Sequence, residues 1–201
     1  MSTVNRSIRI NKEYDDELKK EAKNHGLSLN SLVNQIIEKY VTTYKLIEMF
    51  PCLIIPHEMI KGWLNGLPED FIIKEGAMTG SYIPKHGLFL NKMSPNLDGI
   101  LWVMEKRVSQ HSNWYQFQFQ KNNGKLSLLL RHNLGRKWSI YLNAYYSTLF
   151  KELLNINVES EIGEKSLEIF IPETNKTKNG KNMNNLNNGF NNIEIPINGK
   201  K

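Results

Sequence analysis

The chain begins with a short segment in which apolar and polar side chains alternate. In residues 4–10, Ile8 and Ile10 fall on one face of an extended backbone, and Ser7 and Arg9 fall on the other. This period of two predicts a short strand with one polar face. A strand of this length has two unpaired edges, so it needs a neighbour to pair with.

Two short helices are predicted directly after this strand. Residues 12–24 follow the capping residue Asn11, carry acids in the first turns and lysines later, and end before Gly26. Residues 29–45 follow Ser28, a second capping residue, and repeat apolar side chains at helical spacing. Strand and helices together offer too small a core for one chain, so we expect two chains to build the core jointly.

This order of strand, helix, glycine turn and helix resembles the ribbon-helix-helix DNA-binding regulators of the Arc, MetJ and CopG type. The resemblance covers residues 1–45 and rests on Arg-Ser-Ile-Arg-Ile at 6–10 and Gly-Leu-Ser-Leu-Asn-Ser at 26–31. It implies an intertwined dimer whose two strands pair antiparallel and enter the major groove of double-stranded DNA. Arg6 departs from the family, because it occupies a position that usually holds an apolar residue.

The resemblance assigns roles to both faces of the ribbon. It makes Asn5, Ser7 and Arg9 the base-reading residues, and their side chains suit the task because arginine pairs with guanine edges and asparagine with adenine edges. The alternative is an exposed strand with ordinary polar residues. The opposite face joins the helices in the predicted dimer core, which consists of Ile8, Ile10, Leu18, Ala22, Leu32, Val33, Ile36 and Ile37.

The start of the second helix is the predicted phosphate contact. Amides at a helix N-terminus lack intrahelical partners and favour an anion, and Ser28, Asn30 and Ser31 add side-chain donors. Ser28 can also serve only as the helix cap. The two roles are compatible.

Residues 46–172 predict a separate α+β domain. Short helices are expected at 56–65 and 97–108, and short strands at 71–73 and 88–90. The clearest pattern is a hairpin at 114–132 with Asn-Gly at its turn, a long helix at 136–154 and a second hairpin at 158–171. This order resembles the C-terminal part of small-molecule-sensing folds of the vinyl-reductase and haem-nitric-oxide-binding type.

Charge and composition separate the ends of the chain from its middle. Residues 1–45 hold eight basic and six acidic side chains, residues 46–172 hold thirteen and twelve, and residues 173–201 hold five and two, which accounts for the net charge of +6. The last segment is rich in Asn, Lys and Gly, so it predicts a disordered tail. A nearly neutral middle argues against a second DNA-binding surface.

Several kinds of chemistry lack support in the sequence. The single cysteine, Cys52, excludes a disulfide or a thiolate zinc site within one chain, and the five histidines lack ligand spacing, so no metal or other cofactor is expected. The basic, aromatic stretch 131–138 is typical of a helix start with Trp138 in the core, although Gly135 there would also let an anion approach. Without a catalytic motif or a long apolar run, we expect a non-enzymatic cytoplasmic protein that does not bind membranes.

The sequence therefore predicts a homodimeric transcriptional regulator, with repression favoured, and leaves open whether dimers join into tetramers. The second domain would sense a small-molecule effector or add an oligomer contact. Two alternatives remain: an antitoxin or plasmid copy-control protein that binds a protein partner, and a ligand-binding or enzymatic domain that the first unit only dimerises.

Overall fold

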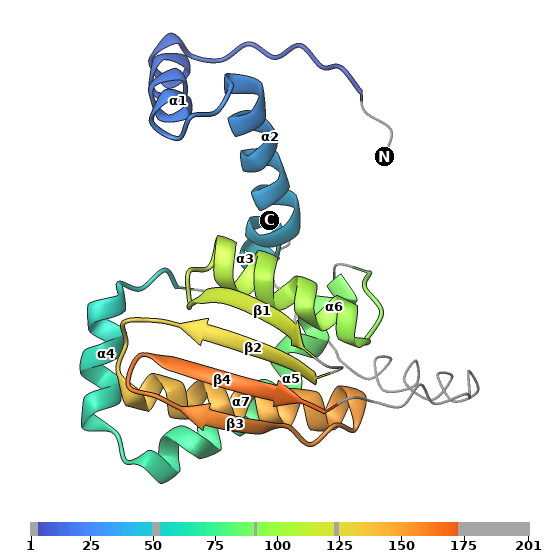
Figure 1. Ribbon diagram of the computed structural model, residues 1–201. Coiled ribbons are helices and arrows are strands. Elements are labelled where there is room, and N and C mark those ends of the chain that lie inside the picture. The colour runs from blue at the N-terminus through green and yellow to red at the C-terminus, as the bar shows by residue number, and fades with distance from the viewer. Residues whose placement is uncertain (1–3, 50–52, 91, 123–124, 173–201) are drawn as a thin grey trace, which may run out of the picture.

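The computed structural model describes residues 4–49, 53–90, 92–122 and 125–172. It is an α+β structure, as predicted, with a four-stranded antiparallel sheet in the described part of the chain. Figure 1 shows a helical layer against one face of this sheet, while the first two helices stand apart at one end of the molecule. The predicted tail at 173–201 lies outside the described residues.

Both N-terminal helices form where the sequence predicts them. Helix α1 spans Lys12–Asn24, and the side chain of Asn11 caps it by accepting a hydrogen bond from the Glu13 amide at 2.9 Å. Gly26 has a φ of +65°, and the Leu27 amide reaches back to the Ala22 carbonyl at 2.8 Å. This is the left-handed helix ending that glycine favours. It lets the chain reverse into α2.

The second predicted helix, residues 29–45, is confirmed, but part of it is π-helical. It consists of α2 (Leu29–Lys39), the π-helical turn η1 (Tyr40–Tyr44) and α3 (Lys45–Met49). The predicted boundary between residues 45 and 46 thus falls within a continuous helical stretch. A π-helical turn is a local widening that often marks a functional position.

The strand predicted at residues 4–10 is not formed in the single chain. Residues 4–11 have no regular secondary structure and run away from α1 as an extended stretch (Figure 1). The physical reason is that a strand exists through hydrogen bonds to a neighbour, and the described strands all pair with one another in the four-stranded sheet. Alternating side-chain polarity indicates an extended backbone, but it does not supply the hydrogen-bonded neighbour that a strand requires.

The sheet has the order β1-β2-β4-β3 and is built from the two predicted hairpins. Strands β1 (Gln116–Asn122) and β2 (Lys125–Arg131) pair with Asn122 opposite Lys125, which confirms the first hairpin, although its turn residues 123–124 are outside the described part. Strands β3 (Glu159–Ile162) and β4 (Ser166–Ile171) form the second hairpin. The two hairpins join through β2 and β4.

Helices α5 (Glu69–Leu90) and α7 (Arg136–Leu154) pack on each other beside the apolar face of the sheet (Figure 1). The core between sheet and helices is dense, with Leu128 and Leu130 of β2 and Phe150 of α7 fully buried. Helix α7 begins at Arg136, directly after its N-cap residue Gly135, and Trp138 is buried in its first turn, as the sequence predicts.

The strands predicted at 71–73 and 88–90 are wrong, because both segments belong to α5. A run of three apolar residues fits either element, and periodicity over three residues cannot distinguish them. The predicted helix at 56–65 is confirmed as α4 (His57–Gly66). The one at 97–108 is divided into α6 (Leu97–Trp102) and the π-helical η2 (Val103–His111).

Candidate nucleic-acid interface

The three predicted base-reading residues occupy the extended segment before α1. Asn5, Ser7 and Arg9 are all exposed, and each is separated from the next by one residue. Such spacing places three side chains on one face of any strand that this segment forms. The single chain therefore presents the predicted reading residues to solvent without fixing their geometry.

The predicted dimer core is largely uncovered in one chain. Of its eight members, Ala22 is buried, whereas Ile8, Ile36 and Ile37 are 66 %, 47 % and 53 % exposed. The apolar stripe continues into η1, where Tyr40 and Val41 are also exposed. Large apolar side chains collected on one helical face and left in water are typical of an interface with another molecule.

The predicted phosphate contact is a capped helix start. The Ser28 hydroxyl accepts a hydrogen bond from the Ser31 amide at 3.1 Å and shares a second one with the Ser31 hydroxyl at 2.8 Å. Capping is therefore confirmed for Ser28. The exposed side chains of Asn30 and Ser31 lie in the same first turn, where the helix dipole favours an anion.

The acidic residues of α1 are partly neutralised within the helix. The Lys19 ammonium lies 2.5 Å from a carboxylate oxygen of Asp15, and His25 Nε2 lies 2.8 Å from Glu21. The hydrogen bond and charge of Asp15 raise the pKa of Lys19. Arg6 and Arg9 of the extended segment take part in none of the ion pairs found among the described residues.

A polar contact that no local pattern in the sequence predicts joins the first unit to the second domain. The Thr43 hydroxyl of η1 lies 2.7 Å from Nδ1 of His111 at the end of η2, and Thr42 lies 3.3 Å from the same nitrogen. Thr43 is buried there. Burial and nearby cations lower the pKa of His111, so a neutral ring bridges the two π-helical turns.

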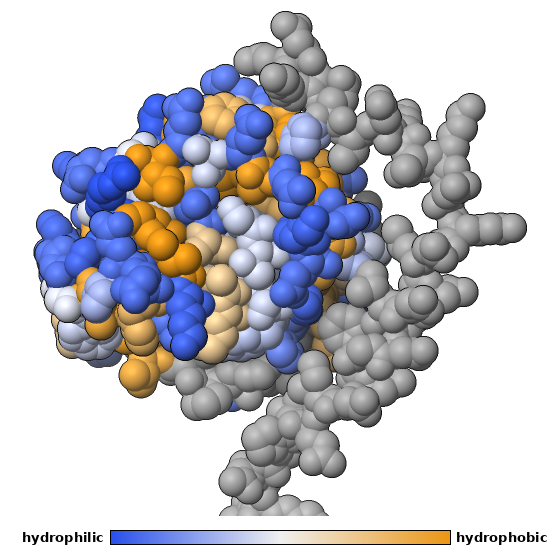
Figure 2. All heavy atoms as spheres, turned by 90° about the horizontal axis from the view of Figure 1, so that it is seen from below, coloured by the Kyte–Doolittle hydropathy of each residue, from blue (hydrophilic) through white to orange (hydrophobic). Residues whose placement is uncertain are grey.

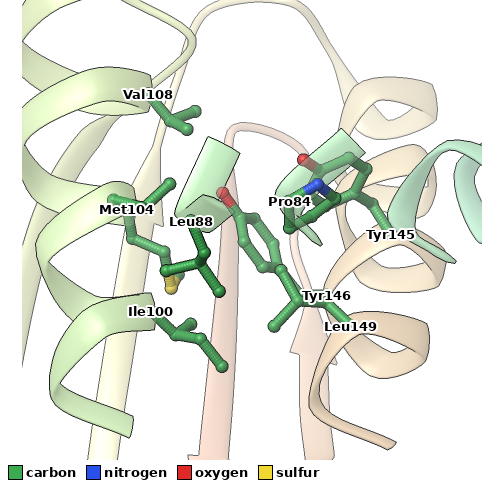
Figure 3. Close-up of a pocket in the computed structure, with 9 residues that line it drawn as sticks. Pro84, Leu88, Ile100, Met104, Val108, Tyr145, Tyr146 and Leu149 are labelled. Carbon is green, nitrogen blue, oxygen red and sulfur yellow. The ribbon is translucent and has the colours of Figure 1, made fainter. Parts of the chain in front are cut away.

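Trp138, at the end of the basic, aromatic stretch 131–138, packs among other aromatic side chains. Trp138 stacks on Tyr141, with ring centres 4.9 Å apart, and packs edge-on against Trp114. An apolar cavity of about 10 Å³ lies elsewhere, between η2 and α7 (Figure 3), where Met104 and Tyr146 line it from opposite sides. That volume holds one water-sized sphere, so the cavity has no room for an effector.

The tyrosines beside this cavity are structural. The hydroxyl of Tyr146 forms a short hydrogen bond with that of Tyr115, which also donates to the Met104 carbonyl at 3.4 Å. Burial raises the pKa of both hydroxyls well above the ordinary value for tyrosine. Both hydroxyls therefore stay protonated at neutral pH and are hydrogen-bonded within the protein.

An open groove of about 460 Å³ lies at the end of the sheet nearest α4. Gln116, Arg131 and Ser166 are register partners across β1, β2 and β4, so they form one row of its floor, and Lys165 adds a second cation. Amides and cations of this kind suit an anionic group. No local pattern in the sequence predicts this groove, because it arises from the pairing of the two hairpins.

His132 lines the groove but is held by the protein. The Leu134 amide donates to its Nδ1 at 3.3 Å, so Nε2 carries the proton and donates to the Ser139 hydroxyl at 2.9 Å. Burial lowers the pKa of His132 to about 4, against an opposing effect of Glu164. Its role is to fix the turn before α7.

In the described part of the chain, no group of three or more His, Cys, Asp or Glu side chains could hold a metal ion. No helix within it is long and apolar enough to cross a membrane.

Comparison with known proteins gives one family match, and it falls on the first unit. Residues 7–37 match the HicB family, a segment that includes α1 and most of α2. No curated protein matches the chain. Among solved structures, a trafficking protein particle complex subunit 3 from Naegleria fowleri, covalently bound to palmitic acid, is similar at 13 % identity and a TM-score of 0.37. That similarity covers 79 % of this chain and 96 % of the other, and at so low a TM-score it carries no argument.

Proposed function

We propose that this chain is a DNA-binding regulator whose first 45 residues form an intertwined dimer and place a two-stranded ribbon in the major groove. The observation that carries the proposal is the uncovered apolar face of α2, which follows an extended segment with alternating polarity. The HicB family match covers the same stretch and supports a link with DNA-binding antitoxins. The proposed role is binding, without catalysis.

Dimerisation would pair the backbone of residues 4–10 and cover the exposed apolar face of α2. Pairing of two copies of residues 4–10 would supply hydrogen-bond partners for both backbones and turn Ile8 and Ile10 toward the helices. Ile36 and Ile37 are already about half buried in one chain, so their complete burial in the dimer would add about 0.7–1.5 kcal/mol for each side chain. This stabilisation is present only in the dimer, because the side chains of each chain are buried against the other chain.

The polar face of the ribbon would then determine which DNA is bound. Asn5, Ser7 and Arg9 would reach base edges, while the first turn of α2 contacts the flanking phosphates. Two copies related by a two-fold axis would favour a site with the same symmetry. We infer repression from the regulator family that the sequence resembles.

The substitution Ile36→Asp tests this proposal. It would place an unpaired charge in the shared core, so we expect loss of the N-terminal dimer contact and of specific DNA binding together. Selection from a random duplex library would define the DNA site for the wild-type chain. Light scattering would then give the mass of each variant, and fluorescence anisotropy its affinity for that duplex.

The matched control is Ile73→Asp, because Ile73 on α5 is 49 % exposed, close to the 47 % of Ile36. It should leave DNA binding unchanged. The proposal is wrong if Ile36→Asp binds the selected duplex as tightly as the wild type does.

The HicB family match favours one second candidate, a DNA-binding antitoxin that also holds a protein partner. Here the second domain would bind that partner. The test is purification of the tagged full chain from its own cells. An antitoxin would carry a second protein at fixed stoichiometry, and expression of that protein alone would arrest growth until this chain is supplied. Purification of the chain without a second protein would reject this candidate.

A further inference from the structure

The open groove at the end of the sheet is large enough for a small organic molecule. Its volume of about 460 Å³ falls within the usual range of ligand pockets, about 300–1,000 Å³. Three segments meet there: residues 113–116 before and at the start of β1, residues 131–133 at the end of β2, and residues 165–166 at the start of β4. We call this site the sheet-end groove.

The lining of the sheet-end groove is mostly polar. On the face of the molecule that Figure 2 shows, hydrophobic side chains reach the surface between hydrophilic ones. In the groove, Trp114 and Tyr115 are aromatic, and the other described lining residues are polar or basic. None of these described lining residues is an aspartate or a glutamate. This composition suits an anionic ligand.

Two cations of the groove, Arg131 and Lys165, are available to such a ligand. Both are exposed, and neither takes part in any ion pair found among the described residues. Glu168 follows on the same face of β4, but its carboxylate accepts a hydrogen bond from Ser127, four residues before Arg131 along β2. That carboxylate is therefore engaged farther along the sheet.

A second carboxylate, that of Glu164, lies beside the turn before α7. One of its oxygens is 3.9 Å from the position that a Cβ on Gly135 would take. Glu164 precedes Lys165 in the chain, yet it is not among the described residues that line the groove. It reduces the positive potential of the turn without occupying the groove.

Backbone pairing fixes where the two cations stand. Arg131 has Ser166 as its register partner on one side and Gln116 on the other, and the His132 amide donates to the Lys165 carbonyl at 2.9 Å. Neighbouring strands lie about 4.8 Å apart, so this row of three residues spans about 10 Å. A guanidinium can hold two oxygens of one phosphate, while an ammonium acts on it as a point charge.

Trp114 gives the groove an apolar wall. Its partly buried ring packs edge-on against Trp138, with ring centres 5.3 Å apart, and against Tyr145 at 5.9 Å. These contacts hold the indole in place at the edge of the groove. Inorganic phosphate would fill only a small part of the available volume, so we expect a ligand with an organic body beside the indole.

We propose that the sheet-end groove binds a small organic phosphate, which acts as an effector of the N-terminal DNA-binding unit. Arg131 and Lys165 hold the phosphate group, and Trp114 packs against the organic body. The ligand site rests on the groove alone. Its role as an effector rests on the proposed DNA-binding function, and the two are tested separately.

The position of the groove supports the effector role. Asn113 of the lining comes two residues after His111, whose ring contacts Thr43 of η1. The turn between them has a φ of +54° at Asn113, and the Asn113 amide donates back to the Ser109 carbonyl of η2 at 3.0 Å. A ligand that holds residues 113–116 therefore acts on the same turn that contacts the first unit. It changes DNA binding if it favours one arrangement of that contact.

The first test measures ligand binding by isothermal titration calorimetry on the full chain without DNA. The probes are adenosine monophosphate, glucose 6-phosphate, inorganic phosphate, succinate and adenosine. We expect at least one of the two organic phosphates to bind more tightly than each of the other three probes. That ligand should also raise the melting temperature of the chain, because it binds the folded state.

Variants of the groove then locate the site. Arg131→Gln and Lys165→Met each remove one cation and should weaken binding of the organic phosphate about 10- to 100-fold. Lys151→Met is the matched control, because Lys151 is exposed on α7 and is not among the described lining residues. It should leave the affinity unchanged. Trp114→Phe should weaken the organic phosphate and leave inorganic phosphate unchanged.

Three results would overturn the ligand site. The first is a chain that binds neither organic phosphate. The second is an affinity that falls in neither Arg131→Gln nor Lys165→Met, with circular dichroism used to confirm that each variant is folded. The third is succinate binding as tight as that of the organic phosphates, which would refute the assignment to a phosphate group.

The second test addresses the effector role by fluorescence anisotropy with the selected duplex. A saturating organic phosphate should change the affinity of the wild-type chain for this duplex at least threefold, and should not change that of Arg131→Gln. An unchanged affinity of the wild type would refute the effector role. If no duplex can be selected, the proposed DNA-binding function and the effector role both fail, and calorimetry still decides the ligand site.

Discussion

Replacement of Gly80 by alanine should destabilise the second domain, although alanine is the better helix former. Gly80 lies within α5, where the helix meets the backbone of α7. An added Cβ would overlap the Tyr145 carbonyl oxygen and lie 2.8 Å from its Cα. Backbone atoms cannot rotate away as a side chain can, so the two helices would have to separate.

The size of the effect follows from two opposing contributions. Alanine in place of glycine stabilises a helix by about 1 kcal/mol. Overpacking of a tight contact costs about 1–3 kcal/mol, and overlap with backbone places this case toward the upper end. We expect the free energy of unfolding to fall by about 1–2 kcal/mol, which lowers the melting temperature by about 5 °C.

Gly62→Ala is the matched control. Gly62 lies inside α4, and nothing is within 4 Å of the Cβ it would gain. We expect this variant to be more stable by about 0.5–1 kcal/mol. Urea unfolding followed by tryptophan fluorescence measures both changes. If Gly80→Ala is as stabilising as Gly62→Ala, the close packing of α5 on α7 is refuted.

Two further predictions concern the second domain. Because the pKa of His132 is about 4 in the fold and about 6.5 in an unfolded chain, its contribution is complete above pH 6.5 and lost as the pH falls toward 4. The loss is at most about 3 kcal/mol, less after solvent screening, and urea midpoints from pH 7 to 4.5 should fall less steeply for His132→Gln than for the wild type. A fragment of residues 46–172 should give dispersed heteronuclear spectra and fail to bind the selected duplex. A disordered fragment, or one that binds tightly, would contradict the two-unit organisation.

Local signals in the sequence predicted much of the secondary structure. The bounds of α1 follow from Asn11 and Gly26, because a cap and a left-handed ending act within a few residues. The hairpins and α7 follow from alternation, the Asn-Gly turn and a long helical period. Each of these signals lies within the element that it specifies or one or two residues beside it.

Features that depend on distant residues were not predictable in this way. Helix α5 was misassigned in part because its packing side is formed by glycines, which leave no apolar period on that face. The pairing of β2 with β4, and with it the groove around Arg131, arises only when the two hairpins meet. The contact of Thr43 with His111 likewise joins residues 68 positions apart.

The base-reading residues of the candidate DNA interface stay a prediction, and the strand that would carry them is not formed in the single chain. Alternation around Ser7 and Arg9 predicts which side chains share a face, whereas the strand itself requires a second chain. The same limit applies to the predicted core, since Ile36 is still 47 % exposed in the single chain.

The specificity of DNA binding by Arg9→Ala tests the central proposal most directly. Affinity for the selected duplex and for a scrambled duplex would be measured at one salt concentration, with Arg6→Ala as the matched control. Arg6 has the same charge but falls on the other face of the extended segment. We predict that Arg9→Ala weakens binding to the selected duplex by about 1–3 kcal/mol and hardly affects the scrambled one, while Arg6→Ala leaves the ratio of the two affinities unchanged. Equal losses on both duplexes for Arg9→Ala, or no loss at all, would contradict base reading by the ribbon.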